Sequence, residues 1–197
     1  MNIVFDLGGV VFNWQPDVIV ASHFEDRSTQ DLVREEIFEH SDWTDLDRGV
    51  ISLERAIDRG AMRTGLPAAE IGRLLSAVPS FLTPIDQTID LIYRLGNTVN
   101  NLFVLSNMSL PSIEYLEQQH DIWGLFKGVV ISSRVKMVKP DIEIYRYLLD
   151  KYRLQPAETV FIDDLPKNLE AASSLGIRTV RFFDSTQCEQ ALLEHRC

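Results

Sequence analysis

The sequence has little of what marks secreted or membrane-spanning proteins. It contains two cysteines, Cys188 and Cys197, and their spacing is neither of a disulfide type nor of a zinc-site type. A reducing, cytoplasmic location is therefore expected. No apolar run approaches the roughly 18 residues needed to span a bilayer, and the first residues lack the basic and apolar segments of a secretory signal. We expect a protein with no membrane partner.

Positive charge is also scarce. The 29 acidic residues outnumber the 19 basic ones, which gives a formal net charge of -10 at pH 7, and no basic cluster occurs along the chain. Proteins that bind nucleic acids need basic patches to neutralise phosphates, so we expect no nucleic-acid partner. An acidic protein can still bind a small anion where a metal ion and a few local donors neutralise the charge.

The 197 residues alternate between two kinds of pattern. Residues 3–5 are apolar and lead through Asp6 into two glycines, which is typical of a buried strand that ends in a tight turn. Residues 17–82 then read as helices only, over a length too great for one crossover connection. From residue 83 onward, expected strands at 102–105, 128–131, 159–162 and 178–182 alternate with helices. This alternation predicts an α/β fold with a doubly wound parallel sheet, formed by residues 1–15 and 83–197, and a helical insertion at 16–82 after the first strand.

Polar side chains follow the expected strands where each strand ends. They are Asp6, the pair Ser106 and Asn107, and the pair Asp163 and Asp164, and Lys139 precedes a further helix. Each can be explained alone, as a turn former, a helix cap or a surface lysine. The carboxyl ends of parallel strands meet at one edge of a sheet, where ligands bind in open α/β folds. We therefore expect these groups to share one crevice.

The residue types in this crevice favour phosphoryl transfer. Clustered carboxylates repel one another unless a cation lies among them, and oxygen ligands suit Mg²⁺. A hydroxyl, an amide and a lysine form a cradle for a phosphoryl group. Asp6 would then attack phosphorus and form an aspartyl-phosphate, which water hydrolyses.

Four short motifs, in order, resemble those of the haloacid dehalogenase-like hydrolase superfamily. They are residues 5–10 (FDLGGV), 104–107 (VLSN), 138–140 (VKP) and 161–164 (FIDD), and a helical insertion after the first motif resembles the family's C1 cap. Within the superfamily, the stretches DLG, DRGVIS (47–52) and KPDIEIY (139–145) resemble bacterial α-D-glucose-1-phosphate phosphatases.

The resemblance implies a role for each motif residue. It implies a catalytic set of Asp6, Ser106 and Lys139, phosphate binding by Ser106, Asn107 and Lys139, and a Mg²⁺ site formed by Asp6, the Gly8 carbonyl and Asp164 with support from Asp163. Asn168 occupies a position where many relatives have a second acid.

Position 8 departs from the family pattern. Most phosphatases of this type have a second aspartate two residues after the nucleophile, which acts as general acid and base, whereas this chain has Gly8. General acid–base catalysis typically contributes about 10²–10⁴ in rate. The proton donor is therefore unassigned, and the substrate, water or a cap residue remains available for that role.

The insertion is expected to select the substrate. His40, Trp43, Asp47 and Arg48 cluster around an expected turn between helices, and an aromatic ring beside polar groups suits a sugar. We take Trp43 and Arg48 as substrate contacts, with packing of Trp43 and solvation of the charges as the alternative.

These observations predict a Mg²⁺-dependent phosphatase, monomeric or homodimeric, that hydrolyses a small phosphorylated metabolite such as a sugar phosphate. Two alternatives remain open. One is a 2-haloacid dehalogenase, whose aspartate attacks carbon without a metal. The other is a catalytically weak regulatory or binding protein that has lost the acid at position 8.

Overall fold

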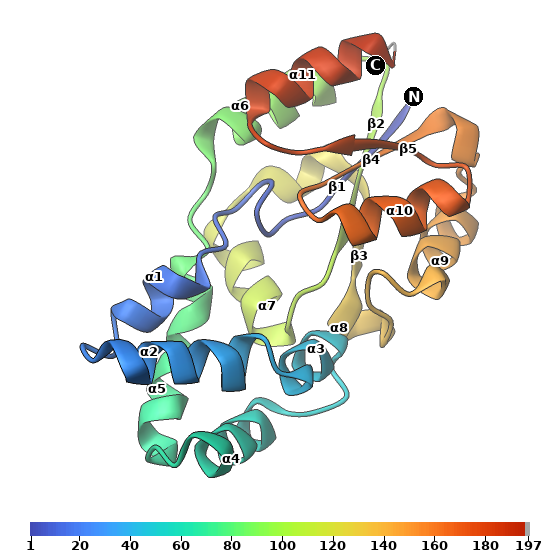
Figure 1. Cartoon of the computed structure of the whole chain (residues 1–197). Coiled ribbons are helices and arrows are strands. Elements are labelled where there is room, and N and C mark those ends of the chain that lie inside the picture. The colour runs from blue at the N-terminus through green and yellow to red at the C-terminus, as the bar shows by residue number, and fades with distance from the viewer. Residues whose placement is uncertain (196–197) are drawn as a thin grey trace.

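A computed structural model describes residues 1–195 and contains a five-stranded parallel sheet in the order β3-β2-β1-β4-β5 (Figure 1). The strands are β1 (Asn2–Phe5), β2 (Asn101–Ser106), β3 (Phe126–Ile131), β4 (Thr159–Asp163) and β5 (Arg178–Arg181). The predicted doubly wound α/β fold is thus confirmed. β1 lies at the centre, which explains why Ile3, Val4 and Phe5 form an unbroken apolar run.

The register of the central strands brings their carboxyl ends together. Phe5 pairs with Val104 on β2 and with Ile162 on β4. The next residues of the first and fourth strands, Asp6 and Asp163, therefore emerge side by side at one edge of the sheet. This arrangement follows from strand polarity alone.

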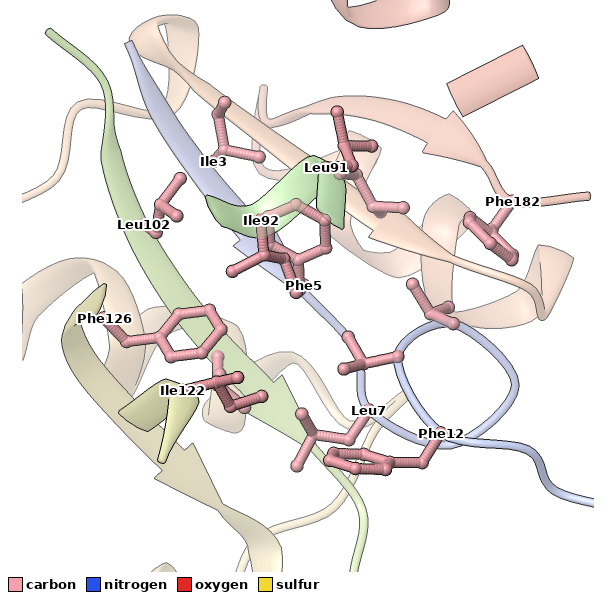
Figure 2. Packing of buried hydrophobic residues seen from close by; sticks show 14 of the residues in the cluster. Ile3, Phe5, Leu7, Phe12, Leu91, Ile92, Leu102, Ile122, Phe126 and Phe182 are labelled. Atoms are coloured by element: carbon pink, nitrogen blue, oxygen red, sulfur yellow. The ribbon is translucent and has the colours of Figure 1, made fainter. Parts of the chain in front are cut away.

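Helices cover both faces of the sheet, and side chains that alternate along β1 define the two cores. Ile3 and Phe5 pack with residues of α6 (Asp86–Gly96), α7 (Leu110–Gln119) and α11 (Ser185–Glu194), and Figure 2 shows Phe5, Leu91 and Ile92 converging in this cluster. Val4 points to the opposite face, where α9 (Ile142–Tyr152) and α10 (Pro166–Ser174) supply the partners.

The insertion is helical and has an apolar cluster of its own. Its elements are α1 (Pro16–Ala21), α2 (Arg27–Val33), the π-helical turn η1 (Arg34–Phe38), α3 (Ser41–Arg48), α4 (Leu53–Thr64) and α5 (Ala68–Phe81). Ile19, Val33, Leu46, Ile71 and Leu74 are central to the cluster. In Figure 1 these helices gather at one end of the molecule. A separate core fits the predicted division at residues 15/16 and 82/83, which stays a prediction.

Side-chain caps mark the start of four described helices, α2, α3, α4 and α11. Ser52 accepts a hydrogen bond from the Arg55 N–H (3.2 Å) at the start of α4, as its position before the helix predicts. α2 begins at Arg27, where Asp26 accepts a hydrogen bond from the Thr29 N–H (2.9 Å). Among the described residues, no helix combines the length and the hydropathy that crossing a bilayer requires.

Three short helices were not predicted from the sequence, because elements of three or four residues carry no hydrophobic period. They are η2 (Ile122–Leu125), α8 (Ser132–Val135) and η3 (Pro156–Glu158). Of these, α8 matters for the site, since it follows β3 directly and contacts α3 of the insertion.

Candidate active site

Asp6 lies at the carboxyl end of β1 and is almost fully buried. Its N–H donates to the Ile162 carbonyl (2.9 Å), which continues the sheet by one residue. Its Oδ1 accepts from the Leu7 N–H (2.7 Å) and lies 2.9 Å from Lys139 Nζ. Burial raises the pKa of Asp6 to about 7; the charge of Lys139 opposes this shift and that of Asp163 adds to it. The carboxyl group is therefore fixed in position by two donors.

Lys139 is a buried cation between two acids. Its Nζ lies 2.9 Å from Asp6 Oδ1 and 2.7 Å from Asp163 Oδ2, and the residue is 3% exposed. Burial lowers the pKa of Lys139, but the charges of Asp6 and Asp163 outweigh burial and hold it above its ordinary value. Lys139 is thus charged, and it joins the ends of β1 and β4.

Asn107 positions Lys139 through its backbone. The Asn107 Oδ1 accepts from the Lys139 N–H (2.8 Å), and its Nδ2 donates to the Lys139 carbonyl (2.9 Å). Both polar ends of this amide are used within the protein. The predicted phosphate-binding pair therefore divides: Asn107 lines the cavity, whereas Ser106 is fully buried at the end of β2. Among the described residues, the Ser106 hydroxyl has no partner in good hydrogen-bond geometry.

Asp163 is saturated with donors. Its Oδ1 accepts from the Leu165 N–H (2.8 Å) and from Asn168 Nδ2 (3.0 Å), and its Oδ2 accepts from Lys139 (2.7 Å) and from Asn168 Nδ2 (3.1 Å). A carboxylate with four such contacts has little capacity left for a direct metal bond. The geometry favours a supporting role for Asp163.

The residues at this edge fit a divalent cation. One carboxylate oxygen from each of Asp6, Asp163 and Asp164 lies within 4.8 Å of the others. Three acids surround the single cation of Lys139, and burial followed by the charge of Asp163 raises the pKa of Asp164. Oxygen donors with surplus negative charge suit Mg²⁺. Gly9 permits this approach: it has φ +77°, and a Cβ there would lie 2.8 Å from Asp164 Oδ2.

A cavity of about 490 Å³ opens above this edge, between the sheet and the insertion. Its floor includes Asp6, Gly8, Lys139 and Asp164. An aromatic wall faces the floor from the insertion side. It consists of Trp14, Phe38 and Trp43, with ring centroids 5.4 Å apart for the stacked tryptophans, 4.8 Å for Phe38 and Trp43, and 5.9 Å for Trp14 and Phe38.

The four residues expected to contact substrate from the insertion separate into two groups. Trp43 and Asp47 line the cavity, whereas Arg48 and His40 are not among the described residues that do. Arg48 Nη2 lies 3.2 Å from an Asp141 oxygen, and His40 Nδ1 accepts from the Asp42 N–H (3.0 Å) at the start of α3. Arg48 therefore contacts the α/β core rather than the cavity.

Sequence reasoning missed several charged residues of the lining. Arg34 lies 3.6 Å from an Asp17 oxygen and 3.2 Å from a Glu39 oxygen, and Lys167 approaches from the start of α10. The sequence carries no signal for these positions, because Asp17 lies on α1, Arg34 and Glu39 lie at the two ends of η1, and none of them belongs to a motif.

The fold and the site together define a class of protein: a doubly wound α/β protein with a buried carboxylate after the first strand and an acid pair at the end of the fourth. Residues 3–182 match the sequence profile of the haloacid dehalogenase-like hydrolase family, and the chain belongs to that family.

Individual relatives add to this assignment. A sesquiterpene phosphatase of Aspergillus oryzae is 29% identical over 182 residues, which cover 92% of this chain and 89% of that protein. A phosphorylated carbohydrates phosphatase of Thermotoga maritima is 35% identical over 74 residues, which cover 36% of this chain and 34% of that protein. The predicted resemblance to phosphatases is therefore supported, whereas that to glucose-1-phosphate phosphatases in particular stays a prediction.

Solved structures share the fold. A family enzyme of Bacteroides thetaiotaomicron, crystallised as a mutant with magnesium and inorganic phosphate, superposes with a TM-score of 0.74 at 23% identity over 91% of this chain and 92% of its own. The L-2-haloacid dehalogenase of Xanthobacter autotrophicus superposes with a TM-score of 0.66 at 16% identity over 98% of this chain and 82% of its own. At these identities the likeness concerns the fold.

Proposed function

We propose that this chain is a Mg²⁺-dependent phosphatase that hydrolyses a small phosphate monoester through an aspartyl-phosphate on Asp6. The observation that carries the proposal is the floor of the cavity. There a buried carboxylate is held by Lys139 and lies within 4.8 Å, between oxygen atoms, of two further aspartates. A nucleophile beside both a fixed cation and a cation site is the arrangement that phosphoryl transfer requires.

Each residue of the floor has a proposed part. Asp6 attacks phosphorus, Lys139 neutralises a phosphoryl oxygen, and Asn107, which lines the cavity, orients the phosphoryl group, while Ser106 supports the site from its buried position at the end of β2. Mg²⁺, held by Asp6, Asp164 and the Gly8 carbonyl, would supply further positive charge at the phosphoryl oxygens. Asp163 keeps Lys139 in place through the 2.7 Å contact.

A sugar phosphate is the first substrate class proposed. The aromatic wall offers Trp43 and Trp14 as faces on which a sugar ring stacks, and Arg34, Glu39 and Thr44 offer polar groups for its hydroxyls. The carbohydrate phosphatase of Thermotoga maritima among the relatives supports this class.

A phosphate ester of an apolar alcohol is the second class. Three aromatic rings in mutual contact, with Val78 and Leu82 also in the lining, form a surface on which an isoprenoid chain is buried favourably. Arg34 is already paired with Asp17 and Glu39, which leaves it less available to hydroxyl groups. The sesquiterpene phosphatase relative supports this class.

The dehalogenase alternative fits the charges less well. A haloacid carries its own carboxylate, which the surplus negative charge of Asp6, Asp163 and Asp164 would repel. The alternative of a regulatory or binding protein rests on the acid that is missing at Gly8. Only a measurement of turnover distinguishes such a protein from an enzyme.

One panel of substrates tests the proposal. The purified chain is assayed for phosphate release from hexose phosphates, prenyl monophosphates and p-nitrophenyl phosphate, with Mg²⁺ and with a chelator. We expect turnover that the chelator removes, and the ratio of kcat/KM between hexose and prenyl esters selects the substrate class. Chloride release from a 2-haloacid in chelator would instead establish the dehalogenase, and silence across the panel with Mg²⁺ would favour a binding protein.

A further inference from the structure

Gly8 leaves the site without a proton donor at the usual position. A Cβ at Gly8 would meet Trp14 Cβ at 3.7 Å, which is an ordinary contact. There is therefore room for a side chain at this position, and the sequence supplies none. Release of an alkoxide from phosphorus is difficult without a proton, and a general acid typically contributes about 10²–10⁴ in rate. Another proton donor is therefore needed for esters of poor leaving groups, and a carboxyl group of the cavity is one candidate.

The described residues that line the cavity include several acids besides Asp47. Asp6 and Asp164 belong to the nucleophile and cation site. Asp17 and Glu39 are exposed and lie 3.6 Å and 3.2 Å from Arg34. Asp47 is the remaining carboxyl of the lining, and it is partly buried.

The backbone at Asp47 is fixed against the α/β core. Ser132 Oγ, on α8, donates to the Asp47 carbonyl (2.5 Å), and Lys136 Nζ donates to the Gly49 carbonyl (2.6 Å). Gly49 ends α3 with φ +72°, and a Cβ there would lie 2.6 Å from Lys136 Nζ and 2.7 Å from the Ser133 carbonyl. Only glycine allows so close an approach, so the last turn of α3 sits on the core in one position.

The surroundings of Asp47 also favour a protonated carboxyl. Burial raises the pKa of Asp47 to about 7; the Ser109 backbone N–H and Lys139 oppose this shift, and the negative charge of Asp6 adds to it. A group that is protonated in part of the molecules near neutral pH suits both proton donation and proton removal.

We propose that Asp47, supplied by the insertion, is the general acid and base of this site and replaces the acid missing at Gly8. In the first step an Asp6 oxygen bonds to phosphorus, the bond from phosphorus to the ester oxygen breaks, and the leaving oxygen takes the proton of the Asp47 carboxyl. In the second step the Asp47 carboxylate takes a proton from the attacking water as the water oxygen bonds to phosphorus. The bond from phosphorus to Asp6 then breaks and releases inorganic phosphate. This inference rests on the proposed phosphatase function.

The test compares wild type, Asp47→Asn and Asp47→Glu on phosphate monoesters that range from p-nitrophenyl phosphate, a good leaving group, to a primary alkyl phosphate. For Asp47→Asn we expect kcat/KM on the alkyl ester to fall about 10²–10⁴-fold and that on p-nitrophenyl phosphate to change little. Because hydrolysis of the phospho-enzyme also needs the base, Asp47→Asn should release a burst of p-nitrophenol. Asp47→Glu keeps a carboxyl and should recover part of the alkyl-ester activity.

The controls separate the possible failures. Asp45→Asn changes an aspartate of the same helix whose side chain is not among the described lining, and it should behave as wild type. An equal loss on all esters, or no loss on the alkyl ester, would overturn the role of Asp47 while leaving the phosphatase intact. A wild-type chain inactive on every ester would overturn the phosphatase proposal and this inference with it. Thermal unfolding of each variant verifies folding, and Asp47→Glu carries the comparison if Asp47→Asn does not fold.

Discussion

Two groups of buried carboxylates in this molecule differ in their balance of charge. At the sheet edge, the aspartates Asp6, Asp163 and Asp164 share the single cation of Lys139, and we call these four residues the sheet-edge cluster. Within the insertion, a single aspartate, Asp42, shares the two cations of Arg59 (2.7 Å) and Arg63 (2.6 Å), and we call these three residues the insertion cluster.

This difference in charge balance distinguishes the candidate active site from a cluster that stabilises the insertion. In the insertion cluster, Arg63 also donates to the Glu36 carbonyl (2.9 and 3.1 Å) and lies 3.4 Å from a Glu36 carboxylate oxygen, so α3, α4 and η1 are tied together and two acids balance the two arginines. The sheet-edge cluster keeps surplus negative charge beside an open cavity, which costs stability unless a cation is bound. Replacing an aspartate with asparagine should therefore lower the free energy of unfolding in the insertion cluster and raise it in the sheet-edge cluster.

The largest expected effect is loss of turnover in Asp6→Asn. An amide does not attack phosphorus as a carboxylate does, so kcat should fall by about 10⁴–10⁶-fold, as in other enzymes that lose their nucleophile. Phosphate release in the presence of Mg²⁺ measures the effect. Activity within tenfold of wild type, about 1.4 kcal/mol in barrier height, would remove Asp6 from the nucleophile's role.

The next effect is loss of stability in Asp42→Asn. Removing the acid leaves Arg59 without its carboxylate partner and Arg63 with Glu36 alone, and breaking a buried pair costs about 3–5 kcal/mol. Arg59 is 40% exposed, so we expect about 2–4 kcal/mol in the free energy of unfolding, measured by denaturant titration. Asp58→Asn, an exposed aspartate of α4, is the matched control, with a change of about 0.5 kcal/mol or less. The kcat of the folded Asp42→Asn protein should match wild type.

The pH dependence of this loss checks its origin. Burial acts to raise the pKa of Asp42, but the hydrogen bonds and charges of Arg63 and Arg59 outweigh it and hold the pKa below the ordinary value of 3.8. A depressed carboxyl pKa contributes stability that is fully present above the unfolded pKa and is lost as the pH falls through the folded one. The gap between wild type and Asp42→Asn should be constant near neutral pH and should narrow only below about pH 4. A gap that narrows well above pH 4 would show that the pairing of Asp42 with the arginines is not its origin.

The two clusters also differ in how far the sequence predicts them. Asp6, Lys139, Asp163 and Asp164 could be grouped in advance because each follows a strand or begins a helix, and parallel strands bring such ends to one edge. The pairing of Asp42 with Arg59 and Arg63 could not be predicted, since it depends on how α3 packs on α4 and no motif marks it.

The same limit explains why the different positions of Asp47 and Arg48 could not be predicted. Both lie in the DRGVIS stretch, and the sequence gives no reason to separate them. Their different positions follow from the docking of α3 on α8, a helix of four residues without a hydrophobic period. That contact turns Arg48 toward Asp141 and leaves Asp47 in the cavity lining.

The smallest expected effect is a gain of stability in Asp6→Asn. Burial raises the pKa of Asp6 to about 7, with Asp163 adding to the shift against Lys139, so the ionisation of Asp6 lowers the stability of the folded state as the pH rises from about 4 to about 7, and this cost is constant at higher pH. At pH 8 in chelator, the neutral amide should raise the free energy of unfolding by about 1 kcal/mol. Added Mg²⁺ should stabilise wild type more than the variant, because a cation that binds the native state adds its binding free energy. A variant less stable than wild type in chelator would show that the contact between Asp6 and Lys139 outweighs the repulsion, and the sheet-edge cluster would then be as balanced as the insertion cluster.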